Sequence, residues 1–303
     1  MSVPNGSEDY DALLRKAREV SRRDFGEKGY IFTQIGLNAS PCTGNCSFCS
    51  LAMCNTDRSE MLERPLEDVV ALVSKTDFTR VTAVFLMTTA DFDPEKFLEY
   101  GRAVRQVIPD EIALVANTAD FDRAYAHRMR DAGFTGVYHI VRLREGIDTG
   151  IAPETRIQSL DAAEAEGLRI YYCIEPIGPE HTYDELVTEM LRARKYHVDV
   201  MAAMRRVNVA GTPYETGAVI SDAELTKIVA VTRLVVMPRV SMNVHEPNRN
   251  AMAAGVNQLY AELWVNPRDS SRKTEESRGY SVDQVTELLA ENGCRPCIEK
   301  RIP

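Results

Sequence analysis

The sequence lacks the features that mark membrane, secreted and nucleic-acid-binding proteins. No apolar run approaches the length of a membrane span, and the first sixteen residues contain no hydrophobic stretch of the signal-peptide kind. We therefore expect no membrane partner and a cytoplasmic location. The 36 Lys and Arg residues against 45 Asp and Glu residues give a net charge of -9. This balance leaves no basic surface for nucleic acid.

Linkers and low-complexity segments are also missing from the 303 residues. No Pro-rich or Gly-rich stretch divides the chain, and a hydrophobic content of 44% is enough for one large core. We expect a single domain over residues 1–303, with a helical leader at 1–29 and a tail at 293–303. The reducing cytoplasm would keep the seven cysteines available for metal rather than for disulfides.

Three of those cysteines form the most informative pattern in the chain. Cys42, Cys46 and Cys49 follow a C-x3-C-x2-C spacing, with Phe48 directly before the third; residues 42–49 are called the cysteine loop below. Three thiolates can hold three corners of a 4Fe–4S cube and leave the fourth iron without a protein ligand. A structural zinc site is the alternative, but such sites usually combine two separated C-x2-C pairs or include histidine.

Short apolar runs alternate with helical patterns along the rest of the chain, and this alternation predicts a parallel sheet. Eight such runs predict a (β/α)8 TIM-type barrel, complete or nearly complete. Helix starts are predicted at Asp93, Thr182, Ser221 and Ser281. The predicted strands are 30–37, 81–87, 112–116, 136–141, 168–174, 198–209, 235–244 and 256–265.

The cysteine loop follows the first predicted strand directly. Loops after the strands of a parallel barrel form its carboxyl-terminal face, where active sites lie. We therefore expect the cluster at one rim of the barrel mouth. The loop resembles the signature of the radical S-adenosylmethionine (SAM) enzymes, and the resemblance implies that the open iron chelates SAM and yields a 5'-deoxyadenosyl radical.

A site for SAM needs acceptors for its ammonium group, a cation for its carboxylate and partners for its ribose hydroxyls. The strand ends supply all three kinds of group, although each residue could instead be a helix cap or a solvated ion pair. In that order, the candidates are Thr88 and Thr89, Arg142 or Arg144, and Glu145 or Asn117. Phe48 is counted with them.

Other polar residues at the strand ends are expected to line the substrate end of the cavity. So many charged and hydrogen-bonding groups favour a small substrate with carboxylate or amine functions. The candidates are Glu175, Arg205, Arg206, Asn208, Asn243 and His245.

Nearly the whole chain resembles one branch of the radical SAM superfamily, that of biotin synthase, methylornithine synthase and a hydrogenase maturase. Residues 175–182 are similar to the branch's stretch after strand five, which implies that Ile177 packs against adenine. Residues 207–213 are similar to its Val-x-Gly-Thr-Pro segment, and residues 254–257 to its Gly-Ala-Asn motif. The resemblance implies an enzyme of cofactor or amino-acid-derived biosynthesis and an electron donor of flavodoxin or ferredoxin type.

The remaining cysteines bear on the reaction. Biotin synthase holds a second, sulfur-donating cluster inside its barrel, but Met87 and Asn117 stand near the places of two of its cysteine ligands. A second iron–sulfur cluster that donates sulfur is the alternative to rearrangement or fragmentation. Its possible ligands are Cys54, Cys173, Cys294 and Cys297. The alternative of another class is a non-catalytic iron–sulfur or zinc protein on a barrel scaffold.

Overall fold

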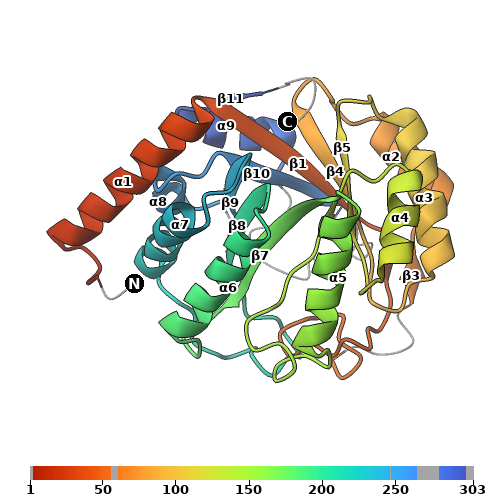
Figure 1. Ribbon diagram of the computed structural model, residues 1–303, viewed down its shortest axis with the longest axis horizontal. Coiled ribbons are helices and arrows are strands. Elements are labelled where there is room, and N and C mark those ends of the chain that lie inside the picture. The colour runs from red at the N-terminus through yellow and green to blue at the C-terminus, as the bar shows by residue number, and fades with distance from the viewer. Residues whose placement is uncertain (1–2, 56–60, 246, 265–279, 298–303) are drawn as a thin grey trace.

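The strands close into a parallel barrel that is surrounded by helices (Figure 1). The computed structural model describes residues 3–55, 61–245, 247–264 and 280–297. Eight strands pair in parallel, and the barrel closes where the first pairs with the last, with Tyr30 opposite Gln258. The predicted (β/α)8 barrel is confirmed.

Helices connect successive strands, as parallel pairing requires. The barrel strands are β1 (Lys28–Gly36), β4 (Val81–Met87), β5 (Ala113–Asn117), β6 (Gly136–Tyr138), β7 (Arg169–Ile177), β8 (Val200–Arg205), β9 (Ser241–Val244) and β10 (Gln258–Trp264). Outside the barrel, β2 (Asn38–Ala39) pairs antiparallel with β3 (Leu62–Glu63), and β11 (Arg295–Pro296) pairs with the start of β1.

Side-chain oxygens cap the amino ends of most helices. Asp93, Thr182, Ser221 and Ser281 each accept a hydrogen bond from a first-turn amide, so the four predicted helix starts are confirmed. The helices are α1 (Glu8–Phe25), α2 (Leu66–Ser74), α3 (Pro94–Val107), α4 (Arg123–Asp131), α5 (Pro153–Ala165), α6 (Tyr183–Lys195), α7 (Asp222–Val236), α8 (Arg249–Ala253) and α9 (Val282–Glu291). None of these helices is both long and apolar enough to cross a bilayer.

Aromatic side chains fill the middle of the barrel. Phe85 lies with its ring centre 5.3 Å from that of Tyr171 and 5.4 Å from that of Tyr260, and Phe32 packs against all three. Edge-to-face packing of this kind is favourable beyond the area it buries. Because side chains alternate along a strand, residues two positions further on face the same interior nearer the mouth. The aromatic layer therefore lies below the interior side chains near the barrel mouth.

Three predicted strands were too long by three residues or more. The run 136–141 leaves the sheet after Tyr138. The run 235–244 begins with the last two residues of α7, and β9 starts only at Ser241. The run 198–209 leaves the sheet after Arg205. Apolar periodicity does not distinguish a buried helix end from a strand. The predicted tail is described to Cys297, and its residues 298–303 lie outside the described part, as does residue 265 of the last predicted strand.

The leader helix α1 is held against α7 by a buried arginine. The Arg233 side chain is fully buried, donates from Nε to Ser21 Oγ at 2.8 Å and contacts Asp24 Oδ2 at 2.6 Å. Its guanidinium also lies over the ring of Phe25, 4.5 Å from the ring centre. Ser21 in turn donates to the carbonyl oxygen of Gly255.

We predict that R233A lowers the free energy of unfolding by about 2–4 kcal/mol, because it removes one partner of a largely buried ion pair. Urea denaturation followed by circular dichroism measures this change. R249A is the matched control, since the pair of Arg249 with Glu291 is solvent-exposed on both sides and should matter little. Equal losses in the two variants would contradict the role given to Arg233.

Candidate functional site

The cysteine loop folds back on itself just beyond β2. The amide of Cys42 donates to the carbonyl oxygen of Leu51 at 2.7 Å, and the amide of Met53 donates to that of Cys42 at 3.0 Å. These bonds close the loop at the carboxyl ends of the barrel strands. As a result, Cys42, Cys46 and Cys49 together line a cavity of about 140 Å³, called the cysteine cavity below.

Backbone amides point at two of the three sulfurs. The amide of Ala90 donates to Cys42 Sγ and that of Leu51 to Cys49 Sγ, both at 3.4 Å. Hydrogen bonds to the sulfurs are one of the means by which proteins tune iron–sulfur clusters. Burial raises the pKa of the Cys46 thiol, and the nearby Arg142 guanidinium acts in the opposite direction.

The donor set fits a cluster better than a single metal ion. Within the described ranges, no three His, Cys, Asp or Glu side chains converge tightly enough to hold one ion. A 4Fe–4S cube spreads its thiolates further apart than zinc does, because each thiolate binds a different iron. Three thiols on one cavity, with amides directed at two of them, therefore fit three corners of a cube.

The loop between β6 and α5 holds one side of the cysteine loop. The amide of Gly150 donates to the carbonyl oxygen of Gly44 at 2.7 Å. Both the amide and the hydroxyl of Ser47 donate to the carbonyl oxygen of Asp148, at 2.8 and 3.0 Å. A Cβ on Gly150 would lie 3.3 Å from the oxygen of Gly44, so glycine allows this close approach.

The strand end after β4 holds the other side. The amide and the hydroxyl of Thr43 donate to the two carboxylate oxygens of Asp91, at 2.7 and 2.6 Å. The helix cap that follows is a different residue, Asp93. Asp91 is therefore available to position the cysteine loop.

A larger cavity of about 250 Å³, called the main cavity below, opens beside the cysteine cavity at the barrel mouth. The two share lining residues, among them Cys46, Thr88 and Arg142. The walls of the main cavity come largely from the carboxyl ends of successive strands. A cluster on the three cysteines would therefore face a cavity whose lining combines apolar and polar side chains.

Five of the eight residues predicted to bind SAM line one or both cavities: Phe48, Thr88, Thr89, Asn117 and Arg142. Arg142 stands out because its side chain is only 21% exposed and has Glu175 Oε1 as an ionic partner, at 3.5 Å. Burial alone would lower its pKa, but Cys46 and Glu175 raise the pKa above the usual arginine value. It therefore stays charged.

Three predicted SAM residues are not brought to either cavity. Arg144 pairs with Asp148 at 3.4 Å, and Ile177 is buried in the barrel wall. Glu145 is also buried, and it accepts hydrogen bonds from the backbone amide of Arg142 and the hydroxyl of Thr149 at 2.8 and 2.7 Å. Its carboxylate organises the loop instead of facing a ligand.

The two threonines after β4 differ in what they offer. Thr89 already exchanges two hydrogen bonds with the Asn38 side chain, at 2.7 and 2.9 Å. Thr88 shares one hydrogen bond with the Thr118 hydroxyl at 3.0 Å and lines both cavities. Thr88 is thus the better placed of the two to accept from a ligand.

Half of the predicted substrate residues, namely Glu175, Arg206 and His245, line the main cavity. The other three face elsewhere. Arg205 pairs with Asp222 at 2.7 Å, and Asn243 donates to the carbonyl oxygen of Gln258 at 2.8 Å inside the barrel wall. Asn208 donates to the carbonyl oxygen of Gly217 at 2.7 Å.

Arg206 lines the cavity, but its hydrogen bonds are made to the protein. The guanidinium makes two hydrogen bonds to the Glu180 carboxylate, at 3.0 and 3.2 Å, and one to the carbonyl oxygen of Ala218 at 2.8 Å. It also donates to Asn208 Oδ1 at 3.1 Å and lies 4.2 Å from the ring centre of Tyr214. Arg206 therefore anchors the loop after β8, which forms one wall of the main cavity.

Tyr138, Gln34 and Met204 are lining residues that the sequence analysis did not single out. The hydroxyl of Tyr138 donates to Glu175 Oε2 at 2.7 Å, so it orients a predicted substrate group. Strand alternation could have found all three, since each faces the barrel interior near the end of its strand. They were not predicted because the candidates were taken mainly from the residues that end or follow each strand.

The four other cysteines do not meet. Cys54 is exposed beside the cysteine loop, and Cys173 is buried inside the barrel. Cys294 and Cys297 flank β11, which pairs with the amino end of β1. The nine residues of β1 span roughly 30 Å. A second cluster on these four residues is therefore a prediction that the structure does not support.

The chain is similar to a known protein in sequence and to several solved structures in fold. No family model matches the chain. Biotin synthase from Clostridioides difficile (strain 630) is 23% identical over 246 residues, which cover 77% of this chain and 73% of that protein. The crystal structure of methylornithine synthase (PylB) superposes with a TM-score of 0.82 at 18% identity and covers 97% of this chain and 91% of that chain. The FeFe-hydrogenase maturase HydG from Carboxydothermus hydrogenoformans gives 0.78 at 18% identity, covering 96% and 72%.

The solved structures support the barrel fold, and the cysteine loop and the sequence match indicate the class of chemistry. A C-x3-C-x2-C loop at the carboxyl mouth of such a barrel, in a chain similar to biotin synthase, is the arrangement expected of a radical SAM enzyme. In sequence or fold the chain is similar to biotin synthase, methylornithine synthase and HydG.

We predict that anaerobic reconstitution gives close to four irons per chain, the content of one 4Fe–4S cluster. Replacement of Cys42, Cys46 or Cys49 by alanine should remove most of this iron, as iron and sulfide analysis would show. The variants C54A, C173A, C294A and C297A are matched controls and should retain it. A content near eight irons, or iron loss in the controls, would contradict a single cluster.

We also predict that R206A loosens the wall of the main cavity, because four hydrogen bonds and a ring contact are lost together. Amide hydrogen exchange over residues 207–219 should accelerate by about tenfold or more. R239A removes an arginine paired with Asp199 at the opposite end of the barrel and is the control. Unchanged exchange in R206A would show that the wall does not depend on this anchor.

Proposed function

We propose that the protein uses a 4Fe–4S cluster and SAM to generate a 5'-deoxyadenosyl radical, which abstracts hydrogen from a small polar metabolite. The reaction would be a rearrangement or fragmentation in cofactor or amino-acid-derived biosynthesis. One observation carries the proposal: three thiols line one cavity that shares its wall with a second, larger cavity at the barrel mouth.

In this proposal Cys42, Cys46 and Cys49 hold three irons. Arg142 is the cation for the SAM carboxylate, since its guanidinium lines both cavities. Thr88 accepts from the ammonium group. Asn117, which also lines both cavities, is placed to meet the ribose.

The substrate would occupy the main cavity, where Glu175 and His245 face the interior. The carboxylate of Glu175, held by Tyr138, is suited to an amine. An electron donor of flavodoxin or ferredoxin type is the expected partner, and seven cysteines that form no disulfide suit a reducing compartment such as the cytoplasm.

Positions of the other cysteines weigh against sulfur insertion from an auxiliary cluster. Of the barrel positions that would hold such a cluster in biotin synthase, Met87 and Asn117 line the main cavity as non-thiol residues. Cys173 alone does not supply a ligand set. Rearrangement or fragmentation is therefore the preferred reaction type.

The proposal predicts that the reconstituted, reduced protein converts SAM to 5'-deoxyadenosine. Chromatography after incubation with dithionite measures the product, and an added true substrate should stimulate it. The triple variant C42A/C46A/C49A, treated identically, is the control. Product at the level of this variant would defeat the enzyme proposal and favour a non-catalytic metal protein.

A further inference from the structure

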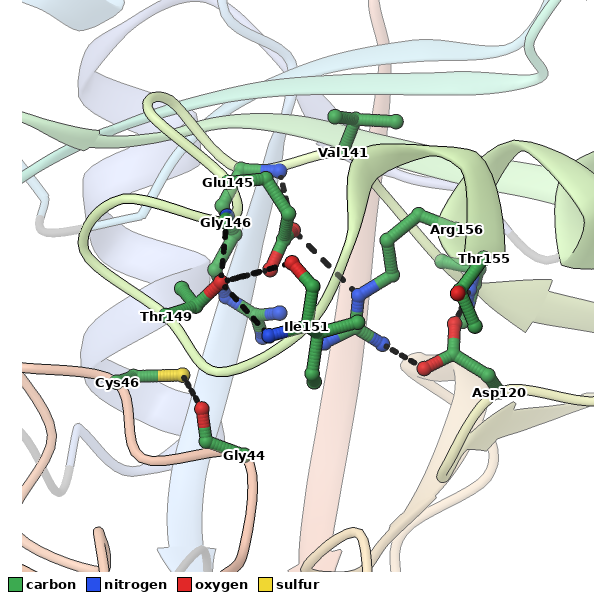
Figure 2. A network of polar contacts seen from close by, with 12 residues as sticks. Gly44, Cys46, Asp120, Val141, Glu145, Gly146, Thr149, Ile151, Thr155 and Arg156 are labelled. Carbon is green, nitrogen blue, oxygen red and sulfur yellow. Dashed lines mark hydrogen bonds and ion pairs between the residues drawn. The ribbon is translucent and has the colours of Figure 1, made fainter.

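A buried arginine outside the predicted site lines the cysteine cavity and lies between two carboxylates. Arg156 extends from α5, and its side chain is only 8% exposed. Its Nη1 lies 3.2 Å from Asp120 Oδ2, and its Nε lies 3.4 Å from Glu145 Oε2 (Figure 2). Figure 2 shows this chain of charges on one side and Cys46 on the facing loop.

Each of the two carboxylates also contacts other residues of the barrel. Asp120 also contacts His139 Nε2, at 3.1 Å, and the Ser159 hydroxyl, at 3.4 Å. Burial would raise the pKa of Asp120, but His139 and Arg156 lower the pKa below its usual range. Asp120 is therefore a carboxylate, and the guanidinium of Arg156 is its main source of positive charge.

Glu145 connects the arginine to the loop that holds the cysteines. Its carboxylate accepts from the hydroxyl of Thr149. The neighbours of Thr149 on either side, Asp148 and Gly150, make the backbone hydrogen bonds to Ser47 and Gly44 of the cysteine loop. The ion pair of Arg156 with Glu145 is therefore connected to the cysteine loop through residues 148–150.

Arg156 can also act on the cluster site through its charge alone, without direct contact. Arg156 lines the cysteine cavity together with Cys42, Cys46 and Cys49, so its positive charge lies near the thiols. Charge interactions are strong in such a buried setting, because little water screens them. The potential of an iron–sulfur cluster depends on nearby charge, and a fixed positive charge favours the form that carries the extra electron.

We propose that Arg156 is a positioning residue that raises the reduction potential of the cluster by offsetting the buried carboxylates of Asp120 and Glu145. The inference rests on the proposed function, since it requires a cluster on the three cysteines. Without Arg156, the carboxylates of Asp120 and Glu145 would lose their shared cationic partner on the wall of the cysteine cavity. Reduction would then become harder at the step that activates SAM.

Redox titration of the reconstituted protein, followed by the electron paramagnetic resonance signal of the reduced cluster, tests this. R156Q should shift the midpoint potential to a more negative value, whereas R156K, which keeps the charge, should stay near the wild type. D120N removes a negative charge and should shift the midpoint in the opposite, positive direction. R239Q, which changes an arginine at the far end of the barrel, is the control.

Iron analysis of each variant separates the possible failures. A wild-type protein that binds no cluster would overturn the proposed function and the inference with it. A loaded R156Q with an unchanged midpoint, or equal shifts in R156Q and R156K, would overturn the inference alone. Should R156Q lose its iron, D120N decides: a positive shift supports the role of charge, and an unchanged or negative midpoint refutes it.

Discussion

Closure of the barrel by parallel pairing of β1 with β10 is the constraint on which the rest of the structure depends. Because all eight strands run in one direction, every strand ends on the same face. Side chains that are far apart in sequence, such as Thr88, Arg142 and His245, are thereby brought around one space. The same closure gives the aromatic layer that separates this space from the amino-terminal end of the barrel.

The cysteine loop depends on that face for its shape. Its contacts to Asp91, Asp148 and Gly150 come from the strand ends after β4 and β6, so the thiols are placed by the barrel rather than by the loop alone. Two arginines that line the main cavity differ in their contacts. Arg206 is bound to Glu180 in the cavity wall, while Arg142 keeps much of its guanidinium toward the cavities.

Much of the fold could be predicted from the sequence, because strand and helix periodicity are local properties. The barrel, the four capped helix starts and the position of the cysteine loop after β1 were all recognisable. Side-chain directions were not, because they depend on register. Arg205 and Arg206 are adjacent and similar, yet one pairs with Asp222 at the surface and the other lines the cavity. Glu145 and Arg156 could not be assigned from spacing, since their roles arise from contacts between separate elements.

The central claim is that one iron of the cluster has no protein ligand and binds SAM. Electron paramagnetic resonance of the reduced, reconstituted protein, recorded before and after addition of SAM, tests it most directly. Binding at the open iron should change the g-values of the cluster signal, and this change should be lost when Arg142 is replaced by methionine. A cluster signal that is identical with and without SAM would contradict the account.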